Sequence, residues 1–134
     1  MPTPKYKRVL LKISGEALIG KKEHGIDDKF INSLAQEITD LKNEGIELII
    51  VIGGGNFFRG SNLEFLGIQR VTADHMGMLA TVINSLALQS SLEEINTQCR
   101  VMSSIAIDAV CEKYIKRKAE RHLEKGRTII LAGG

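Results

Sequence analysis

The alternation of apolar and polar positions predicts a strand near the start of the chain, over residues 8–14. One face of this strand carries Val9, Leu11 and Ile13. The other face carries Leu10, Lys12 and Ser14. Residues 46–52 differ, because every position from Leu48 onward is apolar. Such a continuous run is typical of a parallel strand that is covered on both faces.

Apolar residues recur at helical spacing in three segments. The first is a helix that Asp27 or Asp28 would cap and Gly45 would end, with apolar positions at Phe30, Ile31, Leu34, Ile38 and Leu41. Residues 70–95 predict a longer helix, whose buried stripe is Met76, Leu79, Val82, Ile83, Leu86 and Leu92. Residues 109–125 predict a third helix with a strongly charged face.

Short apolar runs at residues 100–103 and 128–132 predict two further strands. Strands and helices then alternate from one end of the chain to the other. This order predicts an α/β fold, a three-layer sandwich with a mainly parallel central sheet. We interpret residues 1–134 as a single domain of this type.

Composition and charge narrow the function classes. The 134 residues are 43% hydrophobic and 25% charged, and the net charge of +2 is too small to indicate a nucleic-acid or membrane partner. No apolar run is long enough to cross a membrane and no signal-peptide pattern opens the sequence, so we expect a cytoplasmic location. Cys99 and Cys111 match no zinc or redox spacing and are expected to be reduced.

Glycines follow three of the predicted strands, at the edge where ligands bind in open parallel sheets. These turns are Ser14–Gly15, Gly53–Gly55 and Gly133–Gly134. Backbone N–H groups in such turns can approach an anion closely, and phosphate is the expected ligand. Each turn taken alone could equally be a tight connection between a strand and a helix. The sequence contains neither a P-loop nor a dinucleotide-binding fingerprint.

Three side chains near these turns could serve a phosphate or a nucleotide. Lys12 would either extend its amine to solvent or meet a phosphate that gains charge during transfer. Arg59 could hold a phosphate through two hydrogen bonds, or pair with a surface carboxylate. Asp74 would either stabilise the start of the long helix or accept hydrogen bonds from sugar hydroxyls.

Other charged residues have simpler interpretations. His24 and His122 are expected at the surface, and His75 is more typical of a structural histidine than of a catalytic one. The basic run at Lys113–Arg121 contains and adjoins glutamates, so we expect a solvated helix face rather than a nucleic-acid patch.

Three segments, taken together, resemble one family. LLKISGEAL (10–18), VIGGGNFFRG (51–60) and RVTADHMGMLATVINSLAL (70–88) are similar to segments of the bacterial uridylate kinases, which belong to the amino-acid-kinase superfamily. The resemblance extends over residues 6–134. It implies transfer of the ATP γ-phosphoryl group to UMP, giving UDP, with Mg²⁺ accompanying ATP.

The resemblance also implies roles for individual residues. Lys12 would be the catalytic, charge-stabilising lysine. The ATP-binding positions would be Lys12, Ile13, Ser14, Gly15, Gly55 and Arg59. The UMP-binding positions would be Gly54 and Asp74. A region associated with activation by GTP corresponds to Gly20, Lys21, Lys22, Glu23, His24 and Gly25. No protein ligand to a metal is identified.

The family is hexameric, feeds pyrimidine nucleotide synthesis and is commonly inhibited by UTP, and the long helix would lie near a subunit contact. Its members continue well beyond the position that matches Gly134. The chain therefore resembles the amino-terminal portion, and we expect weak UMP binding and little or no turnover from it alone. Two alternatives stay open: a related kinase that acts on a carboxylate, such as an acetylglutamate kinase, and a non-catalytic nucleotide-binding fragment or assembly module.

Overall fold

The computed structural model describes residues 3–57 and 67–134, so Arg59 lies outside the described residues. Within them, the strands are β1 (Arg8–Ile13), β2 (Glu47–Ile52), β3 (Cys99–Ser103), β4 (Glu112–Lys113) and β5 (Thr128–Ala132). The helices are the short 3₁₀ helix η1 (Gly15–Ile19), α1 (Asp28–Asn43), α3 (Arg70–Glu94) and α4 (Lys116–Glu124).

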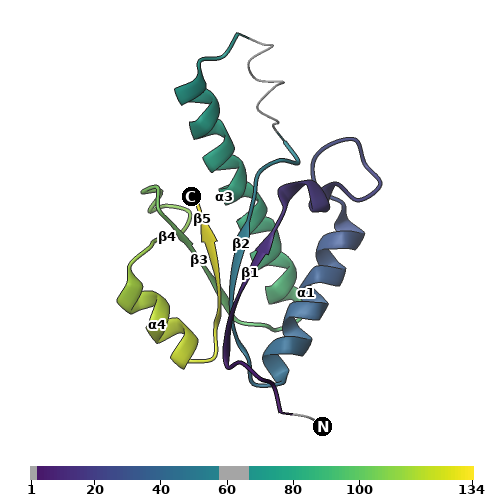
Figure 1. Cartoon of the computed structure of the whole chain (residues 1–134), viewed down its shortest axis with the longest axis vertical. Helices are drawn as coiled ribbons and strands as arrows, with labels where there is room; N and C mark the ends of the chain where they lie inside the picture. Colours follow the sequence, from purple (N-terminus) through teal and green to yellow (C-terminus); the bar gives the residue numbers. More distant parts are fainter. Residues whose placement is uncertain (1–2, 58–66) are drawn as a thin grey trace.

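The five strands form one sheet in the order β1-β2-β5-β3-β4, and every neighbouring pair is parallel. The strand β5 therefore lies between two strands that precede it in the sequence, with Ile129 beside Ile49 and Thr128 beside Cys99. Because all strands run the same way, their carboxyl ends meet at one edge (Figure 1). The predicted parallel α/β fold is confirmed.

Helices cover both faces of the sheet, but unequally. The helices α1 and α3 pack on one face, over a core that includes Ile31, Ile38, Ile50, Leu88 and Ile130. On the other face α4 packs over β3 and β5, through Ala119, Leu123, Met102 and Ile129. Figure 1 shows α4 on the opposite side of the sheet from α1. The three-layer arrangement is as predicted.

The alternation predicted for β1 is present. Val9, Leu11 and Ile13 pack against the core that α1 and α3 cover. Leu10 points to the other face and is 56% exposed, and Lys12 is exposed on the same face. No described helix packs over β1 on that side, which we call the open face of the sheet.

The ends of α1 follow the predicted signals. Asp27, rather than Asp28, is the N-cap, and its Oδ1 accepts a hydrogen bond from the backbone N–H of Lys29 at 2.9 Å. Gly45 follows the C-cap residue with a φ of +91°, a conformation that glycine adopts without strain.

The predicted bounds of α3 agree with the structure to within one residue, but its predicted buried stripe is partly wrong. Leu79 and Ile83 are 46% and 50% exposed. The buried face instead carries three polar side chains, those of Thr81, Asn84 and Ser85. An analysis that counts only apolar positions misplaces such a face, because the polar residues hydrogen bond inside the protein.

The helix predicted over residues 109–125 is wrong in its first part. The strand β4 occupies part of that stretch, with Glu112 beside Met102 of β3. The backbone N–H of Tyr114 then bonds the carbonyl of Ser103 at 2.8 Å, which continues the pairing instead of a helix. The helix α4 begins only at Lys116, and its lysines and arginines are exposed as predicted.

Candidate functional site

The glycine turns that follow β1 and β2 are in direct contact. The N–H of Gly53 donates to the carbonyl of Ile13 at 2.9 Å. A Cβ placed on Gly15 would lie 2.5 Å from the Gly53 oxygen and 2.6 Å from the Gly55 nitrogen. Backbone atoms cannot yield to such a group, so only glycine fits at position 15. Two of the three predicted turns thus form one continuous backbone surface.

Gly54 and Gly55 are also closely packed, each against a different neighbour. A Cβ on Gly54 would lie 2.8 Å from both the Ala80 Cβ and the Gly77 carbonyl oxygen of α3. A Cβ on Gly55 would lie 3.0 Å from the Glu16 side chain. Packing alone therefore explains the missing side chain at position 54. The UMP contact at Gly54 and the ATP contact at Gly55 stay predictions.

The third turn lies at the same edge, after β5. Gly133 has a φ of +83°, and its N–H donates to Thr81 Oγ1 at 2.7 Å. A Cβ at Gly133 would lie 2.8 Å from Ser103 Oγ and 2.9 Å from Ser104 Oγ. Beside it is a cavity of about 240 Å³, whose walls include Val51, Thr81, Tyr114, Leu131, Gly133 and Gly134.

Lys12 is the second-to-last residue of β1, on the open face of the sheet. In the strand register it stands opposite Val51, which lines the cavity of about 240 Å³. None of the described carboxylates forms an ion pair with Lys12. Its ammonium group is therefore available to an anion at this edge.

Ile13 and Ser14, which follow Lys12, each accept a hydrogen bond from a backbone N–H group. Ile13 contributes its carbonyl to the bond from Gly53, and Ser14 Oγ accepts the N–H of Glu16 at 3.2 Å, which caps η1. The predicted ATP contacts of these two residues are untested by this geometry.

Asp74 is not brought against the glycine turns. It is the fifth residue of α3, whose first turns extend past the sheet (Figure 1), and its side chain is 62% exposed. Its Oδ1 accepts from Arg70 Nε at 3.3 Å. Ala80, the α3 residue at Gly54, follows Asp74 by six positions, about 9 Å along a helix. A nucleotide would have to bridge that interval to contact both.

The loop predicted to be regulatory is exposed in its middle and anchored at both ends. Lys21, Lys22, Glu23 and His24 are exposed. At one end the Lys21 N–H donates to Asp27 Oδ2 at 3.2 Å, and this bond, with that from Lys29, lowers the pKa of the Asp27 carboxyl. At the other end Gly25 and Asn56 exchange two hydrogen bonds, of 3.1 and 2.9 Å.

Sequence reasoning missed Asn56, although it directly follows the three glycines. Asn56 is 2% exposed, and its carboxamide meets that of the fully buried Asn84 on α3. Two features of the sequence could have indicated this pair: Asn56 directly follows a glycine turn, and Asn84 lies among apolar residues of the long helix.

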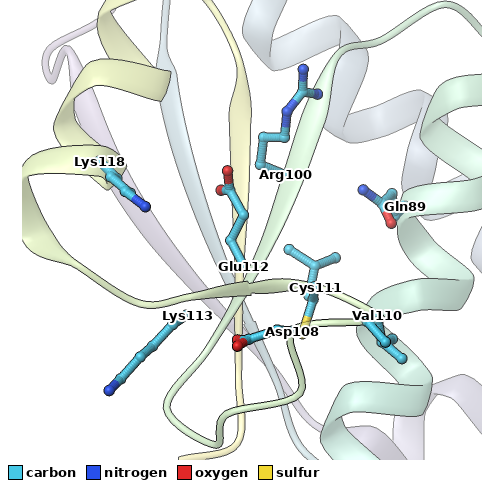
Figure 2. Close-up of a pocket in the computed structure, with 10 residues that line it drawn as sticks. Gln89, Arg100, Asp108, Val110, Cys111, Glu112, Lys113 and Lys118 are labelled. Carbon is cyan, nitrogen blue, oxygen red and sulfur yellow. The ribbon is translucent and has the colours of Figure 1, made fainter.

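A larger cavity of about 560 Å³, drawn in Figure 2, has no residue of the glycine turns in its lining. It is bordered by β3, β4 and the later part of α3, and its charged lining residues are Arg100, Asp108, Glu112, Lys113 and Lys118. The charges are mixed in sign, and none of the predicted site residues lines it.

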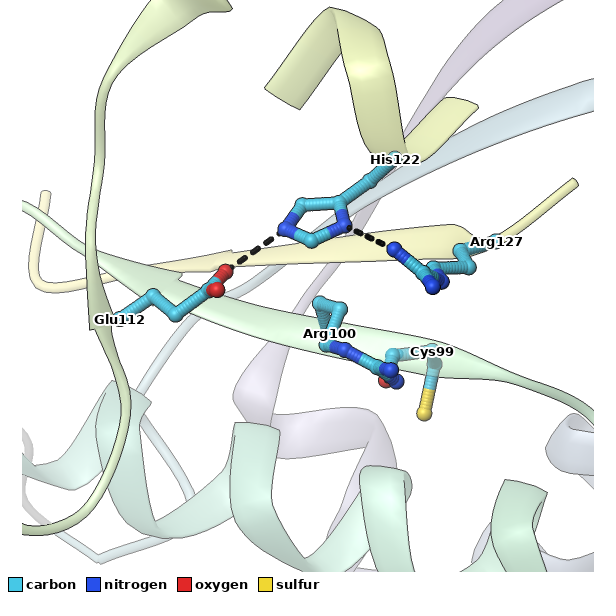
Figure 3. A network of polar contacts seen from close by, with 5 residues as sticks. All are labelled: Cys99, Arg100, Glu112, His122 and Arg127. Carbon is cyan, nitrogen blue, oxygen red and sulfur yellow. Dashed lines mark hydrogen bonds and ion pairs between the residues drawn. The ribbon is translucent and has the colours of Figure 1, made fainter. Parts of the chain in front are cut away.

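His122, predicted at the surface, is buried instead, at 8% exposure. Its Nδ1 lies 3.1 Å from Arg127 and its Nε2 lies 2.7 Å from Glu112, as Figure 3 shows. Because a guanidinium only donates, Nδ1 is the acceptor, and in the neutral ring Nε2 carries the hydrogen that goes to Glu112. This network joins α4 to β4 and β5, and its role is structural.

Neither cysteine offers a nucleophile. Both are free, and burial raises the pKa of Cys99 to about 12 and also raises that of Cys111. The described residues hold no group of three or more metal-ligating side chains. None of the described helices is long and apolar enough to span a membrane.

The structure thus combines a parallel α/β sheet, glycine turns in contact at one edge, and a strand lysine that pairs with none of the described carboxylates. The model of the amino acid kinase family matches residues 7–134, and the chain belongs to that family. Within the family it is similar to the uridylate kinases.

Relatives and solved structures agree on this similarity. The uridylate kinase of Dichelobacter nodosus is 53% identical over 133 residues, which are 99% of this chain and 55% of the relative. That of Xanthomonas axonopodis pv. citri is 57% identical over 129 residues, 96% of this chain and 54% of the relative. The crystal structure of UMP kinase from Bacillus anthracis has a TM-score of 0.91 and 47% identity, over 96% of this chain and 53% of that one. The chain thus spans about half the length of the relatives it matches.

Proposed function

We propose that this chain supplies the phosphate-binding edge and the UMP side of a UMP kinase, which transfers the γ-phosphoryl group of ATP to UMP and gives UDP. The contact between the glycine turns of β1 and β2, beside a Lys12 that pairs with none of the described carboxylates, is the observation that carries this proposal. The similarity to uridylate kinases supports UMP as the acceptor rather than a carboxylate.

The chemistry needs positioning and charge neutralisation more than a covalent partner. Backbone N–H groups of the turns at Gly15 and Gly54–Gly55 would hold phosphate oxygens, and the Lys12 ammonium would balance the charge that develops during transfer. We assign Arg59 to a phosphate and Asp74 to the UMP ribose. Mg²⁺ would arrive with ATP, its ligands supplied mainly by phosphates and water, since no cluster of ligating side chains is found among the described residues.

Assembly and regulation form the outer part of the proposal. Leu79 and Ile83 expose apolar surface on α3, which supports a contact between copies of the chain in a homo-oligomer, a hexamer by analogy with the family. GTP would activate at the loop Gly20–Gly25 and UTP would inhibit. The role would be in pyrimidine nucleotide synthesis in the cytoplasm.

One observation favours a second candidate function, that of a nucleotide-binding module without turnover. Leu10 is 56% exposed on the open face, and Val51 and Leu131 of the same face are only partly buried. A catalytic domain would cover this surface with further polypeptide. Until that layer is present, the chain would bind nucleotide weakly and transfer little phosphate.

A coupled assay of UDP formation, together with calorimetric titration of UMP, tests the proposal. The chain should be measured alone and extended to the length of its relatives. In the extended protein Lys12→Ala is expected to lower kcat by about 10²–10³ with the fold intact, whereas Lys7→Ala, an exposed lysine just before β1, should leave it unchanged.

Two outcomes would contradict the proposal. If the Lys12→Ala protein kept the wild-type rate, Lys12 and the adjacent glycine turns would have no role in phosphoryl transfer. Phosphorylation of acetylglutamate in preference to UMP would move the chain to the other branch of the family. Robust UDP formation by the 134 residues alone would instead refute the second candidate function.

A further inference from the structure

The buried face of α3 is polar where a core-facing helix is normally apolar. Thr81, Asn84 and Ser85 are 6%, 0% and 0% exposed and lie within two turns of the helix. Burying a polar group is costly unless it finds a hydrogen-bond partner, so each of these residues calls for one. Two of the three find it outside the helix, in the glycine turns.

Asn84 bonds the turn that follows β2. Its Nδ2 donates to the Gly53 carbonyl at 2.7 Å and to Asn56 Oδ1 at 2.8 Å. Its Oδ1 accepts from Asn56 Nδ2 at 2.9 Å. Both hydrogens and the oxygen of this carboxamide are therefore used, entirely within the protein.

Asn56 extends the same network to the loop that precedes α1. Its Nδ2 donates to the Gly25 carbonyl as well as to Asn84. The two end partners, the carbonyls of Gly53 and Gly25, can only accept. Neither carboxamide can be reversed without setting an oxygen against a carbonyl, so the pair has one orientation.

Gly53 connects the side chain of Asn84 to the end of β1 through hydrogen bonds of its own backbone. Its carbonyl accepts from Asn84, while its N–H donates to the carbonyl of Ile13. A single residue thus separates the α3 side chain from the strand that carries Lys12. The turn after β1, at Gly15, is in turn held against Gly53 and Gly55 by direct contact.

Thr81 bonds the remaining turn. Its Oγ1 accepts the Gly133 N–H at 2.7 Å and donates its only hydrogen to the Met78 carbonyl at 2.6 Å. Ser85, by contrast, donates only to the carbonyl of Thr81 in its own helix. Ser85 is therefore a natural control: it is equally buried, it is one residue from Asn84, and no described hydrogen bond joins it to a turn.

We propose that Asn84, Asn56 and Thr81 are positioning residues, which hold the turns after β1, β2 and β5 in one register on α3. A displacement of α3 is transmitted to all three turns together, and to the loop that ends at Gly25. The inference rests on the proposed function only for the identity of the ligand, the nucleotide phosphates; the coupling of the turns to α3 stands without it.

Amide hydrogen exchange measures this coupling directly. Asn84→Leu removes the carboxamide and keeps a similar volume. The Gly53 and Gly25 amides keep their own acceptors, Ile13 and Asn56, but lose the side chain that holds the turn in place, so we expect their exchange to quicken about tenfold. Thr81→Val removes the acceptor hydroxyl, so Gly133 should quicken by a similar factor, and Thr81→Ser should restore it. The Ile130 amide, in the central strand, reports global unfolding in every variant.

Ser85→Ala is the matched control, and exchange at the three glycines should then change no more than at Ile130. If Asn84→Leu and Ser85→Ala quicken all amides equally, the polar face stabilises the core in general and the inference fails. Should Asn84→Leu not fold, Thr81→Val and Thr81→Ser decide independently, because valine matches the shape of threonine.

Calorimetric titration of UMP separates this inference from the proposed function. Asn84→Leu is expected to weaken UMP binding about tenfold relative to Ser85→Ala, if UMP is the ligand. If the protein without substitutions, extended to the length of its relatives, binds no UMP while the glycine amides respond as described, the proposed function fails and the positioning role stands. If UMP binds equally well to all variants and the amides do not respond, the positioning role fails alone.

Discussion

The helices α1 and α3 pack side by side on the same face of the sheet, yet their buried sides are built differently. The buried residues of α1 are Ile31, Ala35 and Ile38, and its contribution is apolar packing. The buried side of α3 includes Thr81, Asn84 and Ser85, while Leu79 and Ile83 lie outside. A helix can therefore stabilise the fold by burying apolar surface or by forming hydrogen bonds to particular loops. Hydrogen bonds of this second kind also fix where those loops lie.

The comparison is tested most strongly at Ile38, which is 1% exposed. Ile38→Ala leaves a cavity in an apolar core and is expected to lower the free energy of unfolding by about 2–5 kcal/mol. Urea unfolding measures the loss, with Ser33→Ala on the exposed side of α1 as the control. Local exchange at Gly53 and Gly133 should not rise above global unfolding; a selective rise would mean that α1 also positions the turns.

A smaller effect is expected at the start of α1, where it depends on pH. The Lys21 and Lys29 N–H groups lower the pKa of Asp27 below its ordinary 3.8, so the carboxylate stabilises the folded state above that pH, and the contribution is lost as pH falls through the lowered pKa. Asp27→Ala should lower the urea midpoint at pH 7 more than Asp28→Ala does. That difference should shrink below pH 3.8, and a difference that persisted in acid would point to a role other than the charge.

The smallest effect is expected on the outer side of α3. Leu79→Ser and Ile83→Ser remove exposed apolar groups, and the free energy of unfolding of the isolated chain should change by no more than about 0.5 kcal/mol. Sedimentation velocity at rising concentration should show weaker self-association for both variants if the chain assembles through this side. A stability loss as large as that of Ile38→Ala would mean that these side chains are core residues after all.

Much of the fold was predictable because it depends on patterns of apolar residues. The alternation in β1 agrees with the structure, since burial alone places Leu11 in the core. The caps of α1 also agree, since Asp27 and Gly45 act on the backbone next to them. The helix expected over residues 109–115 was wrong, because the pairing of Glu112 with β3 is a contact between distant segments that local periodicity does not record. His122 was misplaced because a helical pattern does not record that its two ring nitrogens meet Glu112 of β4 and Arg127, the residue just before β5.

The candidate site was predictable in outline only. The position of the glycine turns at one edge follows from parallel strand order, and the structure places them there. The sequence did not reveal why position 54 lacks a side chain, because the residues that would clash with one belong to α3, which is not adjacent in sequence. Asn84 and Thr81 were missed because a helical pattern treats polar residues as outward-facing, whereas these two face loops that the fold brings to them.

The place of β5 in the middle of the sheet has a consequence for how the protein is made. Its neighbours β2 and β3 have no hydrogen bonds to each other, and Ile129 pairs with Ile49, eighty positions earlier. Without β5 the pairs β1-β2 and β3-β4 would be separate, and each would have an unpaired edge where β5 belongs. Such edges are prone to intermolecular pairing, and contacts this distant form slowly. Among the five described strands, β5 is synthesised after the other four and is the one that joins the two pairs.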